Sequence, residues 1–122
     1  DSTLAGKRAM LIVTMGGWEQ HYSLRGINGS IDDIPFPINH GILYYPGYDV
    51  LPSFLLYRVG KLDQNGFNLV ADRLRDRMRT LATTSPIPYR RQNAGDYVIT
   101  TLELRHGLET PGTSGFALHL HD

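Results

Sequence analysis

The sequence predicts an α/β fold built on a parallel sheet, and three observations support this. An apolar run over residues 8–15 ends in two glycines, which is typical of a parallel strand buried on both faces. A second β-prone segment covers residues 48–57, and an amphipathic helix is expected over residues 64–82. With one more helical segment between the strands, the order is strand, loop, helix, strand, helix. That order predicts an open sheet with crossover helices.

The first helical segment begins with a capping signal at Ser30, and Asp32 and Asp33 follow in the first turn, where the helix dipole favours negative charge. Pro37 predicts that the helix is kinked or starts late, and Pro46 with Gly47 ends it. Spacings of three and four residues give it one apolar face: Ile31, Ile34, Ile38, Ile42 and Tyr45.

The second strand and second helix carry their own local signals. Pro52 interrupts the strand and predicts an edge position or a bulge. The helix over residues 64–82 has an apolar stripe of Phe67, Val70, Leu74, Met78 and Leu81. Its alternating charges, which include Asp72, Arg73, Arg75, Asp76, Arg77 and Arg79, indicate a solvated face.

The remaining residues read as a less regular extension. Residues 83–92 form a proline-rich connector, and short strands are expected over residues 96–104 and 116–121. The chain is therefore expected to be one partial domain, with a core over residues 6–82 and a C-terminal extension over residues 83–122. Two parallel strands and two helices cannot cover both faces of a doubly wound sheet, so the expected sheet is only part of one.

Composition limits the function classes. The chain has 122 residues, twelve basic and twelve acidic, so its formal net charge is zero and nucleic acid is an unexpected partner. It has no cysteine, which excludes thiolate catalysis and fits a cytoplasmic location. No apolar run approaches the roughly 20 residues of a membrane span. The first four residues do not read as a signal peptide, and there is no initiator Met.

A series of motifs follows the first strand. They are Val13-Thr14-Met15-Gly16-Gly17, Tyr22-Ser23-Leu24-Arg25-Gly26-Ile27-Asn28-Gly29, Phe36-Pro37-Ile38-Asn39-His40-Gly41-Ile42-Leu43 and Gly47-Tyr48-Asp49-Val50-Leu51. At this spacing they resemble the NAD(P)H:quinone oxidoreductases of the DT-diaphorase type, over roughly residues 6–58. The resemblance implies the C-terminal half of a flavodoxin-like doubly wound sheet. It also implies a homodimer whose active sites lie at the subunit interface.

The resemblance implies roles for individual residues. Thr14, Met15, Gly16 and Gly17 would bind the flavin, and Tyr22 would hydrogen-bond near its O2 atom and help move a proton. Glycines let backbone N–H groups approach a planar ring closely. Many relatives have a histidine where this chain has Asn28. An amide does not titrate near neutral pH, so Asn28 would polarise and position without storing a proton.

Other residues in the chain allow different readings. Trp18 and His21 would either contact the ring or simply pack beside it. Phe36, His40, Tyr44 and Tyr45 would line a pocket or a dimer surface. A strand over residues 116–121 would place His119 and His121 on one face as a weak zinc or copper pair, but no third ligand is evident, so no metal is expected. Ser23, His21 and Glu19 lack the nucleophile elbow of a hydrolase.

The expected activity is two-electron reduction of quinones by NAD(P)H through FAD, with FMN as the alternative cofactor. The sequence has no glycine-rich phosphate loop. In the family that this chain resembles, the phosphate-binding loops come from earlier strands. The rival expectation is a non-enzymatic truncated module that dimerises or binds a partner through an open sheet edge.

Overall fold

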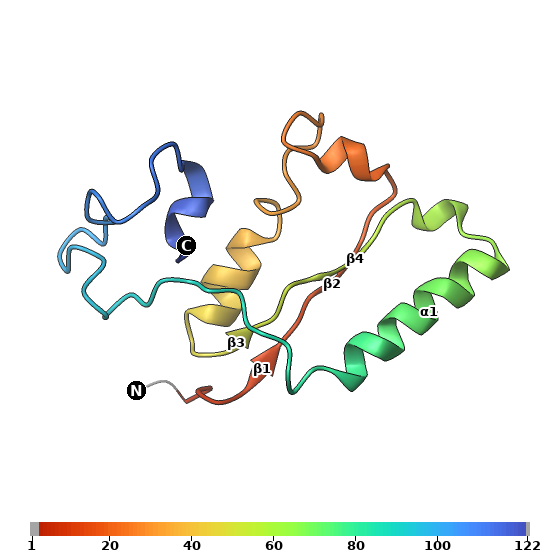
Figure 1. Ribbon diagram of the computed structural model, residues 1–122, viewed down its shortest axis with the longest axis horizontal. Helices are drawn as coiled ribbons and strands as arrows, with labels where there is room; N and C mark the ends of the chain where they lie inside the picture. Colours follow the sequence, from red (N-terminus) through yellow and green to blue (C-terminus); the bar gives the residue numbers. More distant parts are fainter. Residues whose placement is uncertain (1–2, 122) are drawn as a thin grey trace. The chain divides into compact units, whose positions relative to one another are not determined.

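The computed structural model describes residues 3–121 (Figure 1). The chain divides into two compact units, with the boundary between Pro86 and Ile87. Among the described residues, the strands and the long helix all belong to the first unit. The second has no regular strand or α-helix among its described residues. The expected organisation as one domain with a core and an extension stays a prediction.

Both predicted strands are present, and they pair in parallel as expected. Each is divided into two short pieces: β1 (Arg8–Ala9) and β2 (Ile12–Thr14) in the first, β3 (Asp49–Val50) and β4 (Phe54–Leu56) in the second. β1 pairs with β3, and β2 pairs with β4. The core of this unit lies along the second strand, where Val50, Leu51 and Phe54 are almost fully buried.

The interruption at Pro52 is confirmed, because the ladder breaks at this residue. Ala9 pairs with Val50 and Ile12 pairs with Phe54, so the second strand carries one more residue than the first between these pairs. Proline has no N–H to donate to a ladder. An extra residue on one strand also bends it and increases its twist.

The first helix starts late, as Pro37 predicts. It is η2 (Pro37–Tyr44), which has the wider π-type hydrogen bonding, and it ends just before Pro46. Its most buried residue is Asn39, whose side-chain amide donates to the hydroxyl of Ser53. Much of the expected apolar face is exposed: Ile34, Ile38, Ile42 and Tyr45 are between 43% and 72% exposed. The amphipathic pattern therefore does not mark the side of η2 that packs on β3.

The second helix, α1 (Gln64–Arg79), matches its prediction but ends three residues earlier. The Asp63 carboxylate caps it by accepting from the Gly66 N–H at 2.7 Å. Phe67 and Met78 of the apolar stripe stay 57% and 44% exposed. In Figure 1, α1 lies on one side of the strands and η2 on the other, as in a doubly wound sheet.

The charged face of α1 is only partly solvated. Asp72 with Arg75 and Asp76 with Arg79 form exposed ion pairs. Arg77 instead donates to the carbonyl of Pro52 at 2.6 Å, and its guanidinium lies 5.9 Å from the centre of the Phe54 ring. A guanidinium can cover an aromatic face while its N–H groups stay hydrogen-bonded.

Both strands expected in the tail are wrong. Residues 96–104 form a reversal closed by a single antiparallel bridge between Tyr97 and Leu104. Leu102 adopts a left-handed conformation there with φ of 59°, which is incompatible with a strand. Residues 116–121 instead fall largely in the 3₁₀ helix η4 (Gly115–His119). Short alternation is a weak signal for a strand, and within the described chain the pairing in these two segments is limited to the isolated bridges of Tyr97 with Leu104 and of Leu120 with Tyr89.

No helix in the described part of the chain combines the length and apolar character needed to cross a bilayer.

Candidate functional site

The carboxyl ends of β2 and β4 lie next to each other because the two strands are parallel and in register from Ile12 to Thr14. β2 leads into the glycine loop and the short 3₁₀ helix η1 (Glu19–Tyr22), and β4 leads into η3 (Val59–Lys61). Figure 1 shows both short helices beyond the same end of the strands. In open α/β sheets this end is where ligands bind.

Backbone hydrogen bonds fasten the glycine loop to the chain that leaves β4. The Met15 N–H donates to the carbonyl of Leu56 at 2.8 Å, and the Arg58 N–H donates to the carbonyl of Gly17 at 3.0 Å. Val59 N–H donates to the Met15 carbonyl. Met15 itself is buried. The glycine loop is therefore tied to β4 and to the residues that follow it.

The two glycines leave backbone donors available. Gly16 is exposed, and within residues 3–121 neither the Gly16 nor the Gly17 N–H has a hydrogen-bond acceptor. A Cβ on Gly17 would lie 2.8 Å from Nδ1 of His21 and 3.3 Å from the hydroxyl of Tyr22. Gly17 therefore has no room for a side chain, because Tyr22 and His21 lie against it. Such a surface suits a planar ligand that accepts hydrogen bonds from the backbone.

Tyr22 is positioned by one backbone hydrogen bond and one aromatic contact. Its carbonyl accepts from the Ile31 N–H at 2.9 Å, which brings the following loop back to η1. Its ring packs against Tyr57, with the ring centres 5.8 Å apart and the planes tilted by 46°. The structure therefore brings Tyr22 against Gly17.

Burial raises the pKa of the Tyr57 phenol above its usual 10.0. The neighbouring carboxylates of Glu19 and Asp32 and the Tyr22 phenol raise this pKa further. Desolvation and nearby negative charge both disfavour a phenolate. Tyr57 consequently stays a neutral hydrogen-bonding group beside Tyr22 at physiological pH.

The backbone of Asn28 lies near Tyr22, but its side chain does not bond to Tyr22. Its backbone N–H donates to the His21 carbonyl at 2.9 Å, which places it one loop turn from Tyr22. Its side chain is exposed, and among the described residues it makes no hydrogen bond to Tyr22. Gly26 makes this turn possible, since a Cβ there would lie 2.2 Å from the carbonyl oxygen of His21.

Trp18 and Arg58 form a stacked pair at the rim of the glycine loop. The Arg58 guanidinium lies 3.6 Å from the centre of the indole ring, and Trp18 is half exposed. Thr14 is also exposed on this side of β2. The structure thus places Thr14, Met15, Gly16, Gly17 and Tyr22 along one short stretch at the end of β2.

Within the described part of the chain, the structure does not assemble the residues of a hydrolase triad or of a histidine metal site. The Ser23 hydroxyl donates to the carbonyl of Gln20 at 3.0 Å, not to His21. The pairing of His119 with His121 on a strand is wrong, because η4 replaces that strand and His119 Nδ1 lies 2.8 Å from the Tyr97 hydroxyl. Among residues 3–121 no group of three or more metal-ligating side chains comes together.

Comparison with known proteins decides the family. The family model of the flavodoxin-like fold matches residues 1–78, which is well over half of the chain. The chain belongs to the flavodoxin-like family. The parallel strands, the helices on either side of them and the loop at their carboxyl ends are thus parts of a flavodoxin-like fold.

Relatives of this flavodoxin-like chain bear out the resemblance to quinone oxidoreductases. It is 56% identical over 119 residues to the ribosyldihydronicotinamide dehydrogenase-like protein traD of Penicillium crustosum, covering 98% of this chain and 43% of the relative. It is 33% identical over 81 residues to NAD(P)H dehydrogenase [quinone] 1 of Rattus norvegicus, covering 66% of this chain and 30% of the relative.

A solved structure agrees with these relatives. A Klebsiella pneumoniae protein assigned as a candidate quinone reductase is 57% identical, with a TM-score of 0.93 over 98% of this chain and 46% of that one. The flavodoxin-like chain therefore spans less than half the length of the relatives it matches.

Sequence reasoning missed Tyr57 and Arg58. Both follow β4, and the expected parallel pairing of the two strands could have pointed to them. The parallel pairing of the two predicted strands places the residue after the second strand beside the glycine loop. Only the strand register shows that Tyr57 meets Tyr22 and that Arg58 meets Trp18.

Proposed function

We propose that this protein takes part in two-electron reduction of quinones by NAD(P)H through a bound flavin. The single observation that carries the proposal is the pair of backbone N–H donors at Gly16 and Gly17 that have no acceptor within residues 3–121, with Tyr22 lying against Gly17. The names of the relatives support the choice of substrate. The activity, substrate and partners belong to the whole protein.

The chain fits a flavin at this loop. The backbone of Gly16 and Gly17 forms the proposed flavin cradle: a Cβ at Gly16 would meet nothing within 4 Å, and the Gly16 and Gly17 N–H groups would donate to the polar edge of the ring. Thr14 and the buried Met15 would hold the edge of the loop in place. When bound, the flavin accepts hydride from the nicotinamide and passes it to the quinone. The residues of this chain align it and tune its charge.

Tyr22 and Asn28 would serve proton movement and polarisation. Tyr22 would donate a hydrogen bond where negative charge gathers on the reduced ring. Asn28 would polarise the same region from the neighbouring turn without changing its own protonation state. We assign FAD as the cofactor, with FMN as the alternative.

The proposal extends to assembly and location. Leu24 and Ile27, in the loop after η1, are about 90% exposed, and a homodimer would cover them. The chain has no cysteine, which fits a reducing cytoplasm.

The first test is a visible absorption spectrum of the purified protein after it is mixed with FAD and the excess is removed. A retained flavin band supports the cradle at Gly16 and Gly17, and quinone-dependent oxidation of NAD(P)H should follow. A colourless protein would contradict flavin binding by this chain on its own.

The role of Tyr22 is tested with Tyr22→Phe in the flavin-loaded protein. The change removes the hydroxyl and keeps the ring that packs on Tyr57, so turnover should fall by more than flavin content does. Tyr45→Phe is the matched control, because Tyr45 is 72% exposed on η2. Unchanged turnover in Tyr22→Phe would rule out the proton role.

The rival function is a non-enzymatic docking module, and the open surfaces of the first unit favour it. Among the described residues β2 pairs only with β4, and Ile12 on β2 is half exposed. A groove of about 780 Å³ also lies between β4 and α1, lined by residues such as Phe54, Leu56 and Leu69. Flavin-independent dimerisation without any quinone reductase activity would favour this rival.

A further inference from the structure

Arg58 has a backbone conformation that its side chain does not favour. Its φ of 52° and ψ of 41° lie in the left-handed region, where glycine or asparagine is the easier residue. Its N–H is fixed by the Gly17 carbonyl, and its own carbonyl accepts from the Lys61 N–H at 2.9 Å. Strained positions of this kind cluster at functional sites.

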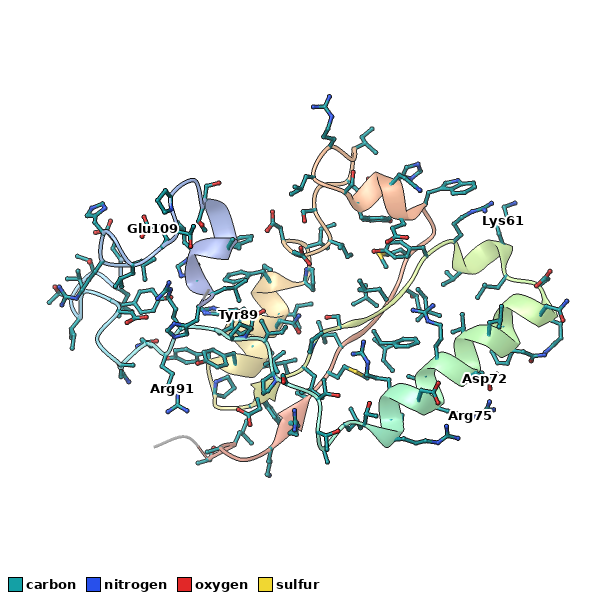
Figure 2. The ribbon with its side chains drawn as sticks, viewed as in Figure 1. Lys61, Asp72, Arg75, Tyr89, Arg91 and Glu109 are labelled. Carbon is teal, nitrogen blue, oxygen red and sulfur yellow. The ribbon has the colours of Figure 1, made fainter. Side chains whose placement is uncertain are left out.

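The side chain at this strained position lies over the face of an aromatic ring. The guanidinium lies 3.6 Å from the centre of the Trp18 indole ring, and among residues 3–121 no carboxylate forms an ion pair with it. Stacking fixes the guanidinium plane and leaves its N–H edge to make hydrogen bonds. Lys61, labelled in Figure 2, adds a second exposed cation from η3.

We propose that Arg58, stacked on Trp18, binds the diphosphate of a nucleotide that enters the candidate site. A pre-oriented guanidinium matches phosphate oxygens with two parallel hydrogen bonds. The backbone bond from Arg58 to Gly17 places this cation beside the proposed flavin cradle. The inference rests on the proposed function, because both a dinucleotide flavin and a dinucleotide hydride donor carry this diphosphate.

The chain contains a built-in reporter for this subsite. Trp18 is its only tryptophan, so tryptophan fluorescence reports on the face that Arg58 covers. The probe is ADP, with adenosine as the phosphate-free control. ADP should change the emission, adenosine should not, and the apparent Kd for ADP should rise with salt.

Arg58→Gly is the decisive variant because it relieves the left-handed strain while removing the cation. It should keep the helical circular dichroism of the parent and weaken ADP binding about tenfold or more. Arg58→Gln should behave alike. Arg91→Gly, which removes an exposed arginine in the second unit, should bind ADP like the parent (Figure 2). Equal ADP affinity in Arg58→Gly and the parent, or a folded parent with no response to ADP, would overturn the proposal.

Two further measurements identify the source of the diphosphate. If Arg58→Gly weakens FAD binding and leaves FMN binding unchanged, the cofactor supplies it. If flavin binding is unchanged and KM for NADH or NADPH rises while kcat holds, the hydride donor supplies it. A variant that changes neither contradicts the subsite. The ADP titration needs no turnover, so a failure of quinone reduction would leave its result standing.

Discussion

At the scale of single residues, Gly17 lies directly against two side chains of the candidate site, His21 and Tyr22. Gly17→Ala would put a methyl group against His21 and the Tyr22 hydroxyl, and displacing them should cost about 1 kcal/mol of unfolding free energy. Gly16→Ala is the matched control, since a Cβ there meets nothing within 4 Å. Urea denaturation of both variants measures the difference. Equal midpoints would show that Tyr22 does not lie against Gly17.

His119 gives the second unit a dependence on pH. Burial, followed by the charge of Arg90, lowers the pKa of His119 below its usual 6.5. The unfolded chain therefore takes up a proton first as the pH falls. The stability that neutral His119 contributes is complete above about pH 6.5 and is lost as the pH falls from there through the folded-state pKa.

The denaturation midpoint should therefore drop less between pH 7.5 and pH 5.5 in His119→Gln than in the parent. The control is His106→Gln, which changes an exposed histidine and should keep the parent's dependence. Protonation would also disturb the 2.8 Å contact between His119 Nδ1 and the Tyr97 hydroxyl. Identical pH dependence in all three proteins would exclude His119 as the responsible group.

At the scale of elements, α1 depends on its cap more than on its packing. None of its residues is fully buried, and the Asp63 carboxylate accepts from the Gly66 N–H at 2.7 Å. Asp63→Ala should reduce the free energy of unfolding by about 1 kcal/mol. Asp72→Ala, which removes only an exposed ion pair, should cost a few tenths of that. Thermal unfolding followed at the helical circular dichroism band would separate the two variants.

The elements that the sequence predicted well are those with strong local signals. α1 combines a cap, a long amphipathic pattern and few helix breakers, and its start at Gln64 agrees with the prediction. The two strands were recognisable from their apolar runs, although the bulge at Pro52 shortened them. The tail strands failed because, among the described residues, each segment pairs through one isolated bridge only, and alternation with so little pairing does not make a sheet.

At the scale of the whole molecule, the second unit depends on one buried cation. Arg90 is 5% exposed and ion-pairs with Asp96 at 2.8 Å. It also donates to the carbonyls of Leu118 and Leu108, and so links segments far apart in the sequence. A unit of this size, near the lower limit of about 40 residues for independent folding, has little apolar core to replace such links.

Arg90→Met should therefore destabilise the second unit by about 3 kcal/mol, because it leaves Asp96 largely buried without a partner. Hydrogen exchange of residues 87–122 should accelerate, while α1 stays protected. Arg75→Met, which breaks an exposed pair on α1, should have almost no effect. A uniform loss of protection over both units would mean that they unfold together.

By itself the sequence determined the α/β class, the parallel strands, the position of α1 and the glycine loop with Tyr22. These depend on local patterns: apolar runs, capping, proline positions and a motif series within roughly 50 residues. Tertiary structure alone decided that Tyr57 packs on Tyr22, that Arg58 stacks on Trp18 and that His119 meets Tyr97. The reason is physical, because strand register and loop closure bring together residues whose spacing in the chain carries no periodic signal.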